Sequence, residues 1–269
     1  PECYKKYDSL EPECPYCSKP KRWSFSKSKV CVTPIWRQIF YFLFGFAGFQ
    51  LIGLLLSLIF CAVGQAMYPI EEDYIAYASS VQVSAAINFI AYAILGAALI
   101  GVSIPSVKKL FNSFKHWTVP VAAIGGYFAI IGFNILYNGF LSMIGVSLTD
   151  NANESTLNFI IADYPLLSLL IFGILGPLCE EITYRLGLYS FSKRLNKYAA
   201  YEITIVVFAF IHFDFGCFSA GTFVNEILNM PFYFAAAFIF TFIYEKFGFG
   251  ASFMSHSIKI LVSVFLTII

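Results

Sequence analysis

The stretch GPLCEEITYRLGLYSF, residues 176–191, places two carboxylates and a guanidinium in an otherwise apolar run. These charged residues are Glu180, Glu181 and Arg185. A charged side chain within a bilayer costs about 2.5–3.5 kcal/mol on insertion scales, so such residues normally face a bundle interior or a wet cavity. The stretch therefore predicts a membrane-spanning helix with a polar site on its buried face.

The rest of the chain is similarly apolar. Hydrophobic residues make up 59% of the 269 residues, charged residues 12%, and the mean hydropathy is +0.74. Soluble domains carry about a quarter charged residues. The composition therefore excludes an ordinary soluble domain and is typical of a polytopic membrane protein.

Seven apolar runs approach the length of about 20 residues that a helix needs to cross a bilayer. The fifth run is short, and the sixth contains Pro231, which kinks or splits many helices. We therefore predict an all-α, polytopic helical membrane bundle of about seven spans, forming a transmembrane domain over residues 38–269. The runs are 38–64, 83–103, 119–146, 164–190, 198–213, 220–245 and 250–269.

Basic residues alternate between the connections of these runs. Of the 17 Lys and Arg residues, 15 fall in the N-terminal tail and in every second loop, and the other loops carry Asp and Glu instead. Because Lys and Arg mark cytoplasmic loops, we expect a multi-pass protein of the cell membrane with a cytoplasmic N-terminus. Arg185 and Lys259 are the two that remain, and both lie within predicted spans.

Residues 1–30 form a cysteine-rich segment before the first span. Cys14 and Cys17 make a Cys-x-x-Cys knuckle, and Cys3 would belong to a second one if a cysteine preceded Pro1. Four thiolates are the ligand set of a structural zinc ribbon. We predict a small cytoplasmic zinc ribbon with these three cysteines among its metal ligands; the alternative is a flexible tail with unconnected thiols.

The two adjacent glutamates are expected to play different roles. Glu181 and Arg185 are four residues apart with the acid first, the favourable order for an ion pair on one helix face. Glu180 points about 100° away and has Tyr184 at the position four residues on, so it is free to accept a proton. The alternative is a buried ion-pair triad that only orients helices.

A histidine in the fifth run lies level with Glu180. Glu180 comes 16 residues before Asn196 and His212 comes 16 residues after it. A helical hairpin folded there places both roughly 20–24 Å from the turn. A carboxylate facing an imidazole is an arrangement for general-base activation of water. The last run adds His256 and, three residues later on the same face, Lys259, which is expected to pair with Glu226 or Glu181 or to snorkel.

In this order, the motifs Glu180-Glu181-x-x-x-Arg185, Phe208-x-x-x-His212 and His256 resemble the CPBP (Abi) family, the CAAX prenyl protease-like intramembrane endopeptidases. The resemblance covers a core of about residues 164–269. It implies a helical bundle that cleaves peptide bonds in a polar cavity. By the same resemblance, Glu180 and His212 activate water, His256 binds the substrate carbonyl and stabilises the oxyanion, and Glu181 and Arg185 support the site.

Two points stay open on this resemblance. The first is the cofactor: two His and one Glu could hold a catalytic Zn²⁺ with an open position for water, as in an intramembrane metalloprotease, or Glu180 and His212 could act without metal as a glutamate-type hydrolase. The second is activity, because the family's last motif commonly continues His-x-x-x-Asn, whereas this chain has Ile260.

The sequence thus predicts an intramembrane endopeptidase that hydrolyses a peptide bond in a membrane-associated protein or peptide. Its expected partners are the lipid bilayer and that substrate, and no nucleic acid. One alternative is a catalytically inactive scaffold of the same fold that regulates a membrane protein partner. Another is an ion- or proton-coupled transporter that uses the same buried charges.

Overall fold

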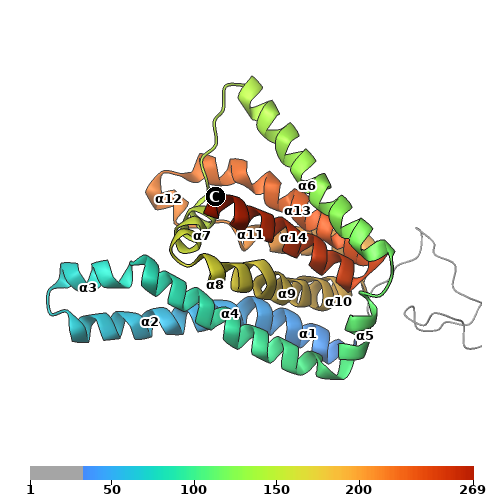
Figure 1. Ribbon diagram of the computed structural model, residues 1–269, viewed down its shortest axis with the longest axis horizontal. Coiled ribbons are helices and arrows are strands. Elements are labelled where there is room, and N and C mark those ends of the chain that lie inside the picture. The colour runs from blue at the N-terminus through green and yellow to red at the C-terminus, as the bar shows by residue number, and fades with distance from the viewer. Residues whose placement is uncertain (1–32) are drawn as a thin grey trace, which may run out of the picture.

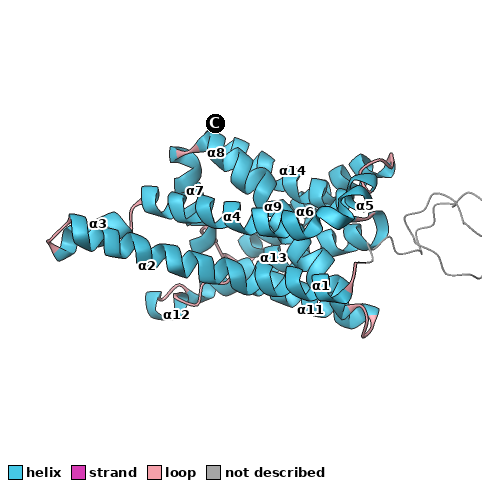
Figure 2. Cartoon of the chain, turned by 90° about the horizontal axis from the view of Figure 1, so that it is seen from below, coloured by secondary structure: helices cyan, strands magenta, loops and turns pink. Residues whose placement is uncertain are grey.

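The computed structural model describes residues 33–269, which form helices joined by short loops and contain no strand (Figures 1 and 2). The predicted all-α bundle is confirmed for this part of the chain. The predicted zinc-ribbon segment, with Cys3, Cys14 and Cys17, lies outside the described residues. The helices are α1 (Ile35–Leu43), α2 (Phe49–Met67), α3 (Glu71–Ala78), α4 (Val81–Ser103), α5 (Val107–Asn112), α6 (Thr118–Met143), α7 (Ala152–Asp163), α8 (Pro165–Leu170), α9 (Gly176–Glu180), α10 (Ser190–Ser192), α11 (Lys197–Phe210), α12 (Cys217–Ala220), α13 (Phe223–Phe247) and α14 (Phe249–Ile268).

Several of these helices join end to end through wider or tighter turns. The connecting pieces are the π-helical η1 (Phe44–Gly48), η3 (Ile171–Leu175) and η4 (Glu181–Tyr189), and the 3₁₀ turn η2 (Ile104–Ser106). Six continuous helices are then long and apolar enough to cross a membrane, so the chain is a multi-pass membrane protein. Within the described residues they are Ile35–Met67, Val81–Asn112, Thr118–Met143, Pro165–Ser192, Phe223–Phe247 and Phe249–Ile268.

The predicted fifth span, residues 198–213, is not among these six. It forms α11, which has 14 residues and is therefore about 21 Å long, short of the roughly 30 Å of a bilayer core. The chain then turns at Ile211 and His212 instead of continuing as a helix. The sixth span is unbroken, because α13 runs through Pro231 without a split. Helices packed in membranes tolerate such prolines.

The helix Pro165–Ser192 occupies the centre of the bundle. It lies between α1 and α4 on one side and α14 on the other, and α11 also packs against it (Figure 1). This helix contains the two π-helical pieces η3 and η4, and every residue of η4 is buried. π-Helical turns are rare and often occur at functional sites. The central helix therefore carries its charged residues into the interior of the protein rather than towards lipid.

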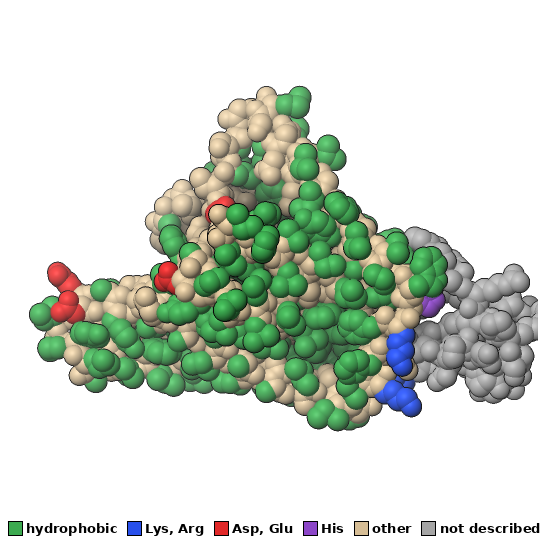
Figure 3. All heavy atoms as spheres, viewed as in Figure 1, with side chains coloured by type: hydrophobic (Ala, Val, Ile, Leu, Met, Phe, Trp, Pro, Cys, Tyr) green, Lys and Arg blue, Asp and Glu red, His purple; other side chains and the backbone are tan. Residues whose placement is uncertain are grey.

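Charge is separated along the long axis of the molecule. In the view of Figure 3, Lys and Arg gather at the end where α1 begins, and Asp and Glu lie towards the opposite end, while the surface between them is mostly apolar. This separation agrees with the alternation seen in the sequence. We call these the basic end and the acidic end.

Candidate active site

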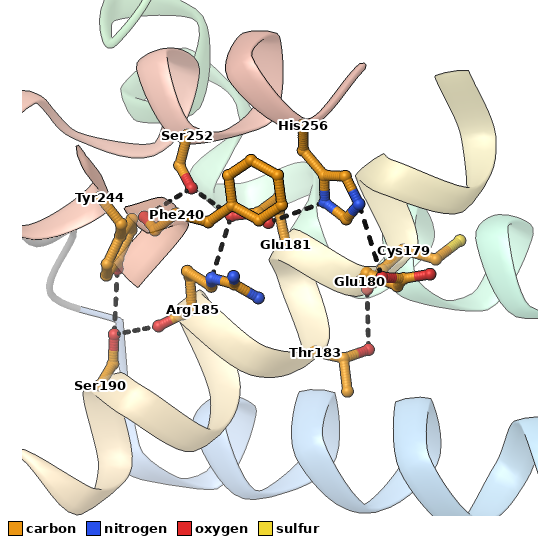
Figure 4. A network of polar contacts seen from close by, with 10 residues as sticks. All are labelled: Cys179, Glu180, Glu181, Thr183, Arg185, Ser190, Phe240, Tyr244, Ser252 and His256. Atoms are coloured by element: carbon orange, nitrogen blue, oxygen red, sulfur yellow. Dashed lines mark hydrogen bonds and ion pairs between the residues drawn. The ribbon is translucent and has the colours of Figure 1, made fainter. Parts of the chain in front are cut away.

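Glu181 and Arg185 form the ion pair that their spacing predicts. Arg185 Nε lies 3.3 Å from Glu181 Oε2, and both side chains are completely buried (Figure 4). The guanidinium lies over the rings of Phe208 and Phe240, at 4.7 and 5.6 Å from their centroids. Because a guanidinium is weakly hydrated and attracted to aromatic faces, this pocket suits Arg better than Lys.

Glu181 is also held by two groups of α14. Ser252 Oγ donates to Glu181 Oε2 at 2.5 Å, and His256 Nδ1 lies 3.1 Å from Glu181 Oε1 (Figure 4). Both carboxylate oxygens therefore have partners. Glu181 ties α14 to the central helix, and its lone pairs are committed to protein contacts.

Glu180 has a different environment although it is the adjacent residue. Its Oε2 has no hydrogen-bond partner among residues 33–269 and lies 3.7 Å from His256 Nε2. Its side chain is 20% exposed, compared with 0% for Glu181. This geometry agrees with the prediction that the two acids are placed differently. Both oxygens of Glu181 have protein partners, whereas Glu180 keeps one oxygen without a hydrogen-bond partner among the described residues.

The open face of Glu180 borders a cavity of about 100 Å³. A water molecule takes about 30 Å³ of liquid, so the space is large enough for a few waters. Tyr92 of α4, Asn153 of α7 and His212 are among the other residues that line it. Glu180 and His212 are each 16 residues from Asn196, and the structure places both at one cavity, as the equal arms of the predicted hairpin indicate.

His212 is oriented by a backbone contact and by an aromatic ring. Its Nδ1 lies 2.9 Å from the carbonyl oxygen of Phe208, so Nδ1 carries the proton and Nε2 keeps its lone pair. Its ring stacks on Tyr233, with centroids 4.5 Å apart and 19° between the planes. A neutral histidine held in this tautomer can accept a proton at Nε2.

His256 connects the two glutamates. Nδ1 contacts Glu181, and Nε2 faces Glu180 (Figure 4). The ring also stacks on Phe240 at 4.4 Å. The structure thus brings the side chains of His256 and Glu180 together, although they belong to different spans. His256 is therefore a buried neighbour of Glu180, and its contact with Glu181 fixes the orientation of its ring.

The comparisons with known proteins concern the segment that carries this site. Residues 162–261 match the Rce1-like family. Its description reads type II CAAX prenyl endopeptidase Rce1-like. The resemblance expected from the three motifs is confirmed for this segment, which contains Glu180, Glu181, Arg185, His212 and His256.

One relative of the chain is a protein of Mycoplasma capricolum subsp. capricolum with the printed name "Uncharacterized protein". It is 28% identical over 177 residues, which cover 60% of this chain and 48% of the relative. The chain thus spans about half the length of this relative. No solved structure matches the chain.

Several contacts of the Rce1-like segment were not predicted from the sequence. Ser252 lies four residues before His256, so helical spacing places it on the same face and could have indicated its contact with Glu181. Tyr233 and Phe240 belong to another helix, and nothing local in the sequence indicates that they stack on His212 and His256.

The predicted ion pair of Lys259 with Glu226 or Glu181 is wrong. Among the described residues it forms no ion pair with Glu226 or Glu181. Glu226 instead accepts from the backbone N–H groups of Ala152 and Asp214, at 3.0 and 3.4 Å. Helical spacing gives the face on which a side chain lies but does not identify which neighbouring helix covers that face.

A catalytic metal would need a set of converging ligands. Within residues 33–269 no group of three or more His, Cys, Asp and Glu side chains is arranged to hold a metal ion. His256 directs its nitrogens to Glu181 and Glu180, and His212 directs Nδ1 to a carbonyl. The described residues therefore do not fit a three-ligand zinc site.

Proposed function

We propose that the chain is an intramembrane endopeptidase in which Glu180 and His212 activate a water molecule. The observation that supports this best is the cavity that the two residues share. The Glu180 side chain is 20% exposed and keeps one buried oxygen, Oε2, without a hydrogen-bond partner among the described residues, and His212 has Nε2 free to accept. A positioned general base contributes about 10²- to 10⁴-fold to a rate. The expected substrate is a peptide segment of a membrane-associated protein.

In the proposed mechanism, a water in the cavity lies between Glu180 and Nε2 of His212. One of these bases takes a proton from the water as its oxygen adds to the scissile carbonyl carbon. His256 donates from Nε2 to the developing oxyanion in its doubly protonated form, because its Nδ1 already donates to Glu181. The proton then passes to the amide nitrogen, the C–N bond breaks, and a carboxylate and an amine leave.

Arg185 and Glu181 act indirectly in this scheme. The buried Arg185 pairs with Glu181, and Glu181 accepts from His256 Nδ1. That contact fixes which nitrogen of His256 faces Glu180. Glu181 and Arg185 are therefore positioning residues rather than groups that touch the substrate.

The remaining expectations belong to the same proposal. We place the basic end on the cytoplasmic side of a cell membrane, since Lys and Arg mark cytoplasmic loops.

We also retain the structural zinc ribbon of Cys3, Cys14 and Cys17 as a proposal for residues 1–30. Metal content of the purified full chain tests it, because Cys14→Ser is expected to release the zinc.

One observation favours a second candidate, an inactive scaffold with this fold. Ile260 stands where the family commonly has Asn, and it packs against an apolar cluster that includes Ile161, Phe172 and Val264. No amide is therefore available from that position for an oxyanion. A scaffold would retain the fold and bind a membrane partner without hydrolysis.

Comparison of peptide termini in cells separates the two candidates. Membrane fractions from cells that express the wild-type chain, Glu180→Gln or His212→Asn at equal levels are analysed by mass spectrometry for newly formed protein ends. The peptidase proposal predicts ends that occur with the wild type and disappear with both variants. Identical sets of ends in all three samples would contradict it and favour the scaffold.

A further inference from the structure

A second polar cavity lies beside the first, towards the acidic end. Its volume is about 280 Å³, and it is bordered by α6, α7, α13, α14 and the segment 148–150. One of these helices, α6, leans away from α13 and α14 along its length (Figure 1). Polar side chains converge on it although three of these helices are membrane spans.

The polar lining follows helical periodicity. On α6, Ile130, Asn134 and Asn138 succeed one another at intervals of four residues and share a face. Asn134 Oδ1 is buried without a hydrogen-bond partner among residues 33–269. On α13, Asn229 and Tyr233 are likewise four residues apart and border the cavity. Amide groups inside a membrane protein are retained where something polar meets them.

Lys259 provides a positive charge at this cavity. It is the tenth residue after Phe249, so it lies about 15 Å along α14, halfway through this span. No carboxylate forms an ion pair with it among the described residues. An intramembrane ammonium without an ion-pair partner in residues 33–269 is expected to meet an anionic group of a ligand.

Two acids also border the cavity, and neither neutralises Lys259 by direct contact. Asp150 Oδ2 accepts from Asn158 Nδ2 at 2.9 Å. Burial raises the pKa of Glu154, while the nearby charge of Lys259 acts in the opposite direction. Both carboxylates lie outside the spans, whereas Lys259 lies within one.

The two cavities are immediate neighbours. Tyr233 stacks on His212, which lines the first cavity, and itself lines the second. The adjacent residues Asn153 and Glu154 of α7 line the first and the second cavity respectively. The two cavities therefore share a wall, formed by the stacked rings of His212 and Tyr233 and by the start of α7, and a peptide bound at Glu180 has to pass this wall to reach the second cavity.

We propose that the second cavity is a substrate subsite in which Lys259 binds a carboxylate of the peptide. This inference rests on the proposed peptidase function. The ammonium pairs with the carboxylate, and the amides of Asn134 and Asn138 bind the peptide main chain, since an Asn side chain both donates and accepts. The carboxylate is either the free C-terminus of the substrate or an Asp or Glu side chain.

Peptide binding to the full chain in lipid nanodiscs tests the subsite. The protein carries Glu180→Gln to prevent turnover. The probes are four synthetic pools of apolar octapeptides, with a free or amidated C-terminus and with or without one Asp. Retained peptides are separated by rapid size exclusion and quantified by mass spectrometry. Further variants add Lys259→Met, Lys259→Arg or, as a control at an exposed lysine, Lys108→Met.

The subsite predicts that carboxylate-bearing peptides are retained about 10- to 100-fold better than amidated peptides without Asp. Lys259→Met removes this preference, while Lys259→Arg and Lys108→Met keep it. A preference for the free C-terminus or for the Asp pool identifies the source of the carboxylate. Equal retention of all pools, no retention of any pool, or a preference that survives Lys259→Met would overturn the inference.

Cleavage of the same pools by the chain without the Glu180→Gln change separates this inference from the proposed function. Cleavage that ignores the carboxylate and Lys259 contradicts the subsite and leaves the peptidase standing. Retention that depends on Lys259, without cleavage of any pool, contradicts the peptidase and shows a binding site for peptide carboxylates.

Discussion

Two carboxylates, the buried Glu245 and the partly exposed Glu180, differ in how completely the protein satisfies them. Glu245 lies near the basic end of α13, accepts from the Tyr201 hydroxyl at 2.7 Å, and pairs with Lys193 and Lys197 at 3.3 and 3.4 Å. Both of its oxygens have partners. Glu180 has an oxygen without a hydrogen-bond partner among residues 33–269 and faces a cavity.

The difference separates a structural carboxylate from one that is available for chemistry. Buried polar groups in proteins are nearly always hydrogen-bonded, so an open one requires an explanation. Glu181 makes the comparison sharper, since it is the adjacent residue and is bound by Arg185, Ser252 and His256. Substitutions of these carboxylates and of their cations therefore separate the two roles.

The largest effect is expected for Glu180→Gln. This change keeps the size of the side chain and removes a base, so turnover of a cleaved peptide should fall about 10²- to 10⁴-fold. The unfolding temperature in detergent should stay unchanged, because Glu180 Oε2 gives up no hydrogen bond. Turnover close to the wild-type rate would remove Glu180 from the mechanism.

Arg185→Met is expected to act on stability first. It leaves Glu181 as a buried charge without its cation, and breaking a buried pair from one side costs about 3–5 kcal/mol. Denaturant unfolding in mixed micelles measures the loss. The double variant Glu181→Gln with Arg185→Met should recover part of it, whereas an equal or larger loss in the double variant would contradict a pairwise origin.

Glu245→Gln should have a smaller effect and spare catalysis. The change removes the charge that Lys193 and Lys197 share, but both ammonium groups keep access to solvent. We expect a loss of about 1–3 kcal/mol in unfolding free energy, of the size of hydrogen bonds to charged groups. Turnover should equal that of the wild type, and a loss of turnover as large as for Glu180→Gln would show that saturation does not distinguish the two roles.

The smallest effect is expected for Lys197→Met. The side chain of Lys197 is 46% exposed and shares Glu245 with Lys193, and an exposed ion pair contributes about 0.2–1 kcal/mol. The same unfolding assay, at low and at high salt, should show a small loss that salt reduces. A loss of unfolding free energy as large as that of Glu245→Gln would contradict this and show that Lys197 provides most of the stabilisation of Glu245.

Helical arithmetic in the sequence predicts a large part of the site. The four-residue spacing predicts the Glu181–Arg185 pair, and the equal arms of the hairpin around Asn196 bring Glu180 and His212 to one cavity. These predictions succeed because they depend on contacts within one helix or between two helices joined by a short turn.

Contacts between distant helices could not be predicted in this way. The surroundings of Lys259, the stacking of Tyr233 on His212, and the short length of α11 all depend on how the other helices pack. The π-helical turn η4 is likewise invisible in the apolar pattern, which has the same composition for either kind of helix. The sequence indicates the face of a helix, and tertiary packing decides what covers it.

The central claim is that Glu180 is open for chemistry while Glu181 is committed to structure. Turnover and unfolding temperature, measured on the same preparations of Glu180→Gln and Glu181→Gln, test it most directly. The account predicts that Glu180→Gln loses turnover at an unchanged unfolding temperature and that Glu181→Gln lowers the unfolding temperature. Normal turnover with a lowered unfolding temperature in Glu180→Gln would contradict it.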